Sequence, residues 1–352
     1  MDLATVWFIA IAVLWTGYFF LDGFDFGVGV LLPVLGRTEK ERRALIDTIG
    51  GVWDGNEVWL IVAAGATFAA FPLWYATMFS SLYVLFLIIL VALIVRGVAF
   101  EFRGRGETQR WRATWDRLLV AGSLVPAVLW GVVFGNIARG LPLDADNLSR
   151  AGLGDLLNWH ALVGGLVTFS LFLLHGALFL RLRTAGELRG RARRAAARIA
   201  PLTLLATVVF LVWTQAHRGT TATVVIGALA VLCVLGAWLL NRTRTAAAGF
   251  AFTGAAIVAA TATLFVALYP AVLPSTIDPA FDLTVHNASS SQYTLTIMTW
   301  AAGIFVPIVV AYQIWSYWVF ARRIGVVAPS RENEASAHRW HWGRHRRADA
   351  SR

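Results

Sequence analysis

Nine apolar stretches recur along the chain and constrain its fold more than any other feature. A stretch of about 20 apolar residues is long enough to cross the hydrocarbon core of a bilayer as a helix. Only helices and closed barrels satisfy their backbone polar groups in lipid, and the roughly ten-residue alternation typical of barrel strands does not appear. The sequence therefore predicts an all-α polytopic membrane protein with nine transmembrane helices, over Ala4–Leu35, Trp53–Phe71, Thr77–Ala99, Leu118–Ile137, Trp159–Leu180, Pro201–His217, Thr223–Leu240, Ala247–Tyr269 and Leu295–Phe320.

Composition supports this class and excludes several others. Hydrophobic residues make up 58% of the 352 residues and charged residues only 14%, whereas an ordinary soluble domain has about 45–50% and about 25%. A single cysteine, Cys233, excludes a disulfide-rich secreted scaffold, and abundant core-forming side chains exclude a disordered chain. The first stretch lacks the basic start of a secretory signal, so we expect it to be retained as a membrane helix.

Basic residues are distributed unequally between the two sides that nine spans define. One side receives 26 of the 30 lysines and arginines, the other receives three, and Arg96 lies inside the third span. By the positive-inside rule, we expect the N-terminus outside and the C-terminus in the cytoplasm. The net charge of +10 is then a topological and lipid-facing feature, and we expect no nucleic-acid partner. Residues 1–324 should form one integral membrane helical domain, and residues 325–352 a polar, basic, disordered cytoplasmic tail.

Charged residues inside the predicted spans are functional candidates, because each costs about 2.5–3.5 kcal/mol on insertion scales. Asp22 and Asp25 in the first span are three residues apart and share a helical face, as do Asp54 and Glu57 in the second. Arg96 in the third span supplies one positive charge. Two interpretations stay open. The carboxylates form a proton relay from the cytoplasm with Arg96 as counter-charge, or they cap helix ends and pair with Arg96 to fix helix packing.

Small and aromatic residues accompany these charges. Gly23 and Gly27 form a small-xxx-small pair that lets a neighbouring helix approach closely. Trp53 directly precedes Asp54, where it either shields that carboxylate or packs near the headgroups. Three histidines lie within predicted spans or at their ends without a ligand spacing, and we expect them to pack rather than to bind haem: His160, His175 and His217.

The outer segment before the last span has the signals of an ordered loop. Pro270 and Pro274 end the eighth span, because proline interrupts helical hydrogen bonding. The Ser289–Ser291 run supplies N-cap candidates for the last span. We expect a packed re-entry loop or a ligand rim, and the residues alone do not separate these two.

Five motifs occur in order from the first predicted span to the last: Gly17-Tyr-Phe-Phe-Leu-Asp-Gly-Phe-Asp-Phe-Gly-Val-Gly29, Trp53-Asp-Gly-Asn-Glu-Val-Trp59, Tyr269-Pro-x-x-Leu-Pro-Ser275, Asn287-Ala-Ser-Ser-Ser291 and Ile314-Trp-Ser-Tyr-Trp318. Together they resemble subunit II of the cytochrome bd quinol oxidases, over roughly residues 1–325. Each motif alone is weak, but five in order make the resemblance specific. It implies a multi-pass protein of the bacterial cytoplasmic membrane. The implied complex oxidises a quinol and reduces dioxygen to water, with protons taken from the cytoplasm.

The resemblance also implies the arrangement of the helices, the partner and the cofactors. Two four-helix bundles plus one peripheral helix are expected, and the chain should pair with subunit I in a pseudo-symmetric heterodimer. Small single-helix accessory subunits are a further expected kind of partner, besides quinol, quinone and lipids. Subunit I should hold two b-type haems and one d-type haem. This chain should ligate no haem iron and should hold a structural quinone.

For individual residues, the resemblance implies a proton pathway at the subunit interface that includes Asp54. Asp25 and Arg96 match family positions as well, whereas the position of Glu57 can carry glutamine, which argues against an essential role. We expect a scaffolding and proton-conducting subunit that is not catalytic alone. The alternative is a proton-coupled secondary transporter or ion channel, but nine spans do not divide into the equal inverted halves typical of that class.

Overall fold

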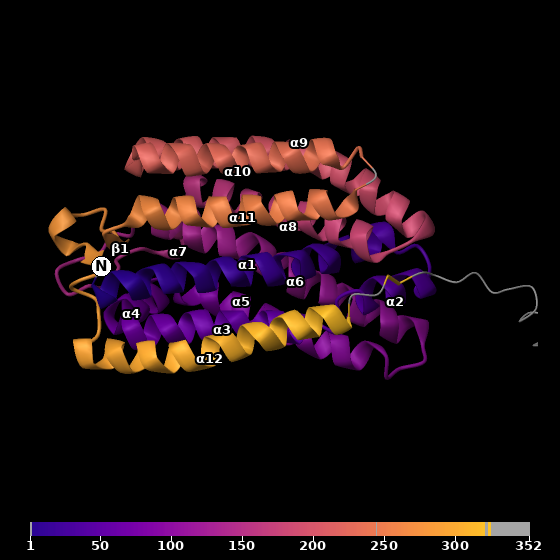
Figure 1. Cartoon of the computed structure of the whole chain (residues 1–352), viewed down its shortest axis with the longest axis horizontal. Helices are drawn as coiled ribbons and strands as arrows, with labels where there is room; N and C mark the ends of the chain where they lie inside the picture. The colour runs from indigo at the N-terminus through magenta and orange to yellow at the C-terminus, as the bar shows by residue number, and fades with distance from the viewer. Residues whose placement is uncertain (1, 244, 321–322, 325–352) are drawn as a thin grey trace, which may run out of the picture.

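The computed structural model describes residues 2–243, 245–320 and 323–324, and this part of the chain is almost entirely helical (Figure 1). Eight of its helices are long and apolar enough to cross a membrane, which confirms the predicted polytopic helical class. The predicted tail, residues 325–352, lies outside the described residues. The eight helices run along the long axis of the molecule (Figure 1) and are α1 (Leu3–Leu35), α5 (Tyr83–Arg103), α6 (Gln109–Arg139), α8 (Trp159–Arg183), α9 (Gly186–Arg218), α10 (Thr221–Leu240), α11 (Ala246–Leu268) and α12 (Gln292–Val319).

The predicted second span is helix α3 (Trp53–Ala70), which has 18 residues. This helix is not one of the eight that qualify by length and composition. It carries two carboxylates, Asp54 and Glu57, which make it less apolar than its neighbours. The count of nine spans therefore stays a prediction.

The third span does not start where the sequence predicted. Instead of one helix from Thr77, a short helix α4 (Pro72–Ser81) precedes α5, and Leu82 between them leaves the helical region at φ −108° and ψ 21°. Pro72 occupies the first turn of α4, and Phe71 before it is pushed out of helical geometry, as proline does to its predecessor. Hydropathy did not reveal this break, because both segments are apolar.

Two other predicted helix starts were too late. Helix α9 begins at Gly186 rather than Pro201, and α6 begins at Gln109 rather than Leu118. Hydropathy marks the part of a helix that suits lipid, but arginine and alanine are also strong helix formers. The helices therefore continue into their basic flanks, and Thr108 caps α6 by accepting a hydrogen bond from the Trp111 N–H.

Helix α1 is the central element, and every residue from 21 to 29 is buried. It lies in the middle of the molecule in Figure 1, with α8 and α11 on one side and α3 on the other. A Cβ atom added at Gly27 would lie 2.1 Å from the Phe172 carbonyl oxygen and 3.0 Å from the Gly176 Cα of α8. The predicted close approach of another helix at Gly27 is thus confirmed.

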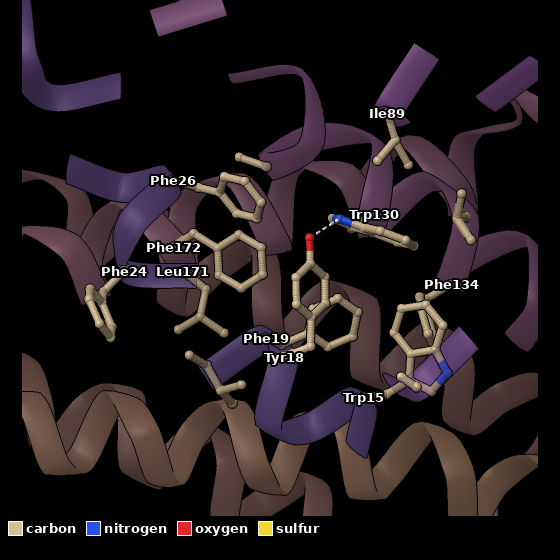
Figure 2. Packing of buried hydrophobic residues seen from close by; sticks show 14 of the residues in the cluster. Trp15, Tyr18, Phe19, Phe24, Phe26, Ile89, Trp130, Phe134, Leu171 and Phe172 are labelled. Atoms are coloured by element: carbon tan, nitrogen blue, oxygen red, sulfur yellow. Dashed lines mark hydrogen bonds between the residues drawn. The ribbon is translucent and has the colours of Figure 1, made fainter. Parts of the chain in front are cut away.

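Aromatic side chains fill the space between α1, α6 and α8 (Figure 2). The rings of Trp15 and Trp130 meet edge to face with centroids 5.2 Å apart. The Trp130 indole N–H donates to the hydroxyl oxygen of Tyr18 at 3.0 Å, the dashed contact in Figure 2. Aromatic pairs in these geometries add attraction beyond their buried area, so this cluster fixes the packing of α1 against α6.

Short elements close the two ends of the molecule. Helix α2 (Glu39–Asp47), which begins with a capping box between Thr38 and Glu41, lies at the end opposite the N-terminus (Figure 1). The N-terminal end carries α7 (Leu153–Leu156), β1 (Ala271–Leu273), the 3-10 turn η1 (Pro279–Phe281) and β2 (Leu283–Thr284), with β1 and β2 paired antiparallel.

The segment before α12 is a packed loop. The Ser290 N–H and hydroxyl donate to the Ala70 and Ala69 carbonyls of α3. Ser291 caps α12 by accepting from the Thr294 N–H, which confirms one of the predicted N-caps. Beyond this anchor α12 packs sparsely, and only Leu295 of its 28 residues is buried.

Candidate functional site

Three helices bring four charged side chains together in the interior. Arg96 on α5 lies 2.8 Å from the Asp22 carboxylate and 4.0 Å from that of Asp25, both on α1. Its other terminal nitrogen lies 3.7 Å from the Glu57 carboxylate on α3. The side chains of Arg96, Asp22 and Asp25 are completely buried, and that of Glu57 is 22% exposed. Four of the residues predicted from the sequence thus form one group, the carboxylate–arginine cluster.

Neighbouring residues hold Arg96 in place. The Phe26 ring of α1 lies 4.5 Å from the guanidinium carbon, a cation–π contact that suits a cation removed from water. On the other side, a Cβ atom added at Gly122 of α6 would lie 2.8 Å from the Arg96 Cβ and 2.7 Å from the Ala92 carbonyl. Helix α6 can therefore approach the backbone of α5 at this level only through a glycine.

The charges of the cluster do not balance. Three carboxylates surround one guanidinium, so full ionisation would leave two negative charges without a counter-charge among the described residues. An unpaired buried ion costs several kcal/mol, whereas a bound proton removes the charge. The Oδ1 atom of Asp25 is buried and accepts no hydrogen bond in the described part of the chain. This arrangement can take up and release protons.

A network of neutral polar side chains extends the cluster, and sequence reasoning missed it. The Asn56 side-chain amide of α3 donates to Asp25 Oδ2 at 2.7 Å and to the Leu21 carbonyl at 3.2 Å. Its oxygen accepts from Gln313 Nε2 at 3.1 Å and from the Tyr317 hydroxyl at 2.8 Å, both on α12. The available signal was the spacing of Gln313 and Tyr317. They are four residues apart in the apolar last span, which puts them on one face of the helix.

Asp54 and Trp53 lie outside the cluster. Asp54 is exposed and has no ion pair or hydrogen bond with the described residues. Trp53 stacks on Phe100 of α5, with ring centroids 4.7 Å apart. The structure therefore gives Trp53 a packing contact, while Asp54 faces away from the bundle on the same side as Val58 and Ile61.

The cluster lies nearer to one end of the molecule. At 1.5 Å per residue, Asp22 is roughly 28 Å from the start of α1, and Asp25 is roughly 15 Å from its end at Leu35. The buried aromatic rings around Tyr18 and Trp130 fill the bundle on the N-terminal side. The shorter distance from the cluster to an aqueous surface therefore runs toward the end that carries α2.

Ion pairs fasten α2 at that end. Arg103 of α5 donates to both Glu39 oxygens at 3.0 Å and to Asp116 of α6 at 2.5 Å. Glu41 binds Arg191 of α9 and accepts from the backbone N–H of Arg37 at 2.8 Å. Burial alone would raise the pKa of Glu41, but these hydrogen bonds outweigh it and hold the pKa below its usual value.

The interior histidines are engaged by protein groups. His160 contacts the Gly135 carbonyl and the Thr214 hydroxyl, each at 3.1 Å, through its two ring nitrogens. His175 contacts the Thr253 hydroxyl at 2.6 Å and the Phe20 carbonyl at 3.3 Å. Because both ring nitrogens of each are taken, neither offers a free nitrogen to a haem iron. His217 is exposed and contacts the Trp213 carbonyl.

An apolar groove of about 1060 Å³ separates α12 from α1 and α11. Its walls include Phe8, Phe20 and Phe265, and Tyr269 lies at the end near the loop. Trp59 and Gln313 also line the groove. Through Gln313 it adjoins the hydrogen-bond network around Asn56.

Comparisons with known proteins agree on one family. The sequence profile of cytochrome bd terminal oxidase subunit II matches residues 3–320. The cytochrome bd ubiquinol oxidase subunit 2 of Bacillus subtilis (strain 168) is 43% identical over 93% of this chain and 98% of that protein. The cytochrome bd-I ubiquinol oxidase subunit 2 of Escherichia coli (strain K12) is 36% identical over 91% and 94%.

A solved structure matches the fold. A chain of the bd oxidase from Geobacillus thermodenitrificans superimposes with a TM-score of 0.72 at 20% identity, over 91% of this chain and 99% of that one. The apolar helices and the family together make this a multi-pass protein of the bacterial cytoplasmic membrane. The chain belongs to the cytochrome bd terminal oxidase subunit II family, whose members are subunits of an oxidoreductase complex.

Proposed function

We propose that this chain is the non-haem-ligating subunit II of a respiratory quinol:dioxygen oxidoreductase, which scaffolds subunit I and carries protons toward it. The complex oxidises a quinol and reduces dioxygen to water, with protons taken from the cytoplasm. Family membership supports this reaction over transport of a solute. The observation that carries the proton role is the group of three carboxylates, two of them fully buried, around a single arginine.

The proposed topology has nine spans, with α3 as the second, the N-terminus outside and the C-terminus in the cytoplasm. Contacts between basic segments support a common side for them. Arg42 and Arg103 both bind Asp116, and Arg191 binds Glu41, so the segments around α2, α6 and α9 meet at one end. Arginine-rich segments on one side are what the positive-inside rule expects of the cytoplasm. The arrangement as two four-helix bundles plus peripheral α12 belongs to the same proposal.

The proposed proton route runs from Asp54 through Glu57 to Asp25 and Asp22. Asp54 is exposed, Glu57 is partly exposed and the two aspartates are fully buried, so these carboxylates form a series of increasing burial. Residues three apart on a helix are neighbours on its surface, which suits transfer from Asp54 to Glu57. Arg96 contacts both Asp22 and Glu57, so it balances one negative charge on either of these carboxylates.

The proposed surface for subunit I consists of the outward faces of α3, α5 and α12. These faces carry large exposed apolar side chains: Val58, Ile61, Phe68, Leu90, Val91, Ile94, Trp300 and Trp318. Lipid could cover apolar side chains equally well, but it does not suit a carboxylate. Asp54 lies on the exposed side of α3 with Val58 and Ile61, and a protein partner there would cover the carboxylate at which the proposed proton route begins.

The haems of the complex, two of b-type and one of d-type, are assigned to subunit I. The engaged nitrogens of His160 and His175 fit a chain that supplies no axial ligand. For a structural quinone, the groove beside α12 has the apolar walls that an isoprenoid chain requires. Such a quinone would supply packing between α1, α11 and α12 when bound.

The test uses the assembled complex in vesicles, with Asp54→Asn as the variant and Glu101→Gln as the control. Glu101 is an exposed carboxylate on α5 without an ion pair among the described residues. Quinol-driven oxygen consumption and proton uptake should fall in Asp54→Asn and stay normal in Glu101→Gln. Full activity of an assembled Asp54→Asn complex would overturn the route. Loss of assembly would instead favour a packing role for this residue.

A further inference from the structure

The hydrogen bonds of Asn56 determine which oxygen of Asp25 is free to bind a proton. Asn56 is completely buried on α3 and faces α1 and α12. One end of its amide lies 3.2 Å from the Leu21 carbonyl oxygen. A carbonyl only accepts hydrogen bonds, so the amide atom facing it must be the nitrogen. This fixes the orientation of the amide independently of any other contact.

With the orientation fixed, all four hydrogen-bonding positions of the amide are used. Nδ2 donates one hydrogen to Leu21 and the other to Asp25 Oδ2 at 2.7 Å. Oδ1 accepts from Gln313 and Tyr317. Asp25 Oδ2 is therefore held as an acceptor. In a protonated carboxyl group the carbonyl oxygen accepts a hydrogen bond better than the hydroxyl oxygen, so this contact favours the proton on the other oxygen. Its partner atom Oδ1 is buried and receives no hydrogen bond from the described residues.

Helix α12 holds the amide from the other side. Gln313 and Tyr317 are four residues apart and so lie on one face of a helix that is otherwise nearly all exposed. Without these two donors, the buried Asn56 oxygen would lose both of its partners. Leaving a buried acceptor unsatisfied is unfavourable, so the Asn56 side chain would shift and its hydrogen bond to Asp25 would weaken.

We propose that Asn56 is a positioning residue for Asp25: held by Gln313 and Tyr317, it fixes Oδ2 as an acceptor, so that Oδ1 is the oxygen that binds and releases the proton. This inference rests on the proposed proton route through Asp25. The proton binds to Oδ1 of the carboxylate and leaves from the same atom, and no other bond changes. Oδ2 is then the carbonyl oxygen of the protonated acid, with an N–H donor on it.

Infrared difference spectroscopy of the assembled complex reads this arrangement directly, because the C=O stretch of a protonated carboxyl group responds to a hydrogen bond on its oxygen. The band of Asp25 is identified as the one missing in Asp25→Asn. In Asn56→Leu it should move to higher wavenumber, since Oδ2 loses its donor. The double variant Gln313→Leu/Tyr317→Phe should move it in the same direction. Tyr312→Phe, which removes an exposed hydroxyl on the same helix, should leave it in place.

An unchanged Asp25 band in Asn56→Leu overturns the proposal, and so does a wild-type complex without such a band. If Asn56→Leu does not assemble, the double variant on α12 still decides, because it alters no buried side chain of α1 or α3. Proton uptake separates this inference from the proposed function. Uptake that is lost in Asp25→Asn but normal in Asn56→Leu leaves the route intact and removes the positioning role. Normal uptake in Asp25→Asn removes the route itself.

Discussion

The guanidinium of Arg96 lies 2.8 Å from the carboxylate of Asp22, and neither side chain is exposed at all. Each residue comes from a different helix, α5 and α1. A buried ion pair of this kind depends on both members, because removing one leaves the other charge unpaired. The pair therefore couples the packing of α1 and α5 to the charge state of the cluster.

Replacement of Arg96 should destabilise the protein more than any exposed arginine does. Arg96→Gln should cost about 3–5 kcal/mol, the typical loss when one partner of a buried pair is removed. The double variant Arg96→Gln/Asp22→Asn should recover part of that loss, because it also removes a carboxylate. Thermal unfolding of the purified complex measures the loss of stability in Arg96→Gln and its partial recovery in the double variant. Arg117→Gln serves as the control, since Arg117 is exposed and has no ion pair among the described residues. A double variant that is no more stable than Arg96→Gln would contradict the coupling.

A side chain at Gly27 should separate α1 from α8. Gly27→Ala would place a methyl group 2.1 Å from the Phe172 carbonyl oxygen, a backbone atom that cannot move aside alone. Overpacking of this kind costs about 1–3 kcal/mol, so the yield of folded protein and its melting temperature should fall. Gly65→Ala on α3 is the matched control, because nothing lies within 4 Å of its added Cβ. Equal melting temperatures for the two variants would refute the close contact.

Acid should weaken the attachment of α2 through Glu41. The pKa of this carboxyl is lowered from its ordinary value of 4.5, because hydrogen bonds from Arg191, Arg37 and Thr38 outweigh the effect of burial. A lowered pKa in the folded state adds stability above the unfolded value, and that stability is lost as the pH falls below about 4.5 through the folded pKa.

The melting temperature should accordingly fall less steeply with acid in Glu41→Gln than in the unchanged protein, and it should be lower at neutral pH. Thermal unfolding at a series of pH values between 3 and 7 measures this difference. Glu107→Gln, at an exposed residue without an ion pair among the described residues, provides the comparison. Parallel profiles of melting temperature against pH for Glu41→Gln and the unchanged protein would argue against a stabilising role of the ionised Glu41.

The hydrogen bond between Trp130 and Tyr18 should stabilise the aromatic cluster. Tyr18→Phe keeps the ring but leaves the buried Trp130 N–H without its 3.0 Å acceptor, at a cost of about 1–3 kcal/mol. Trp130→Phe together with Tyr18→Phe should cost less than the sum of the single changes, because no donor remains unpaired. The control is Tyr293→Phe, since Tyr293 is 77% exposed. If the stability losses of the two single variants simply added up in the double variant, the result would count against the hydrogen bond.

The charged members of the site could be predicted because a charge inside an apolar span is conspicuous. Asp22, Asp25, Glu57 and Arg96 all stood out in this way, and the fold brings them together. Asn56 lies in the same motif but is uncharged, and it was passed over. The amide and hydroxyl on α12 were missed for the same reason, although they complete the network.

The roles of Asp54 and Asn56 show what a sequence leaves undecided. Two residues apart on a helix are rotated by roughly 200° from each other, so one must face inward when the other faces outward. Nothing in the residues themselves says which side of α3 meets α1. The fold turns Asn56 inward and leaves Asp54 exposed.

The sequence alone determined the membrane class, most of the spans and the unequal distribution of basic residues, because apolar length and charge are local properties of a segment. Helix ends in basic flanks, the break at Leu82 and the partners of each buried polar group were decided only by the tertiary structure. Those features depend on which helices touch and at what level. A contact between α3 and a helix more than 250 residues later, such as Asn56 with Gln313, leaves no local trace in the chain.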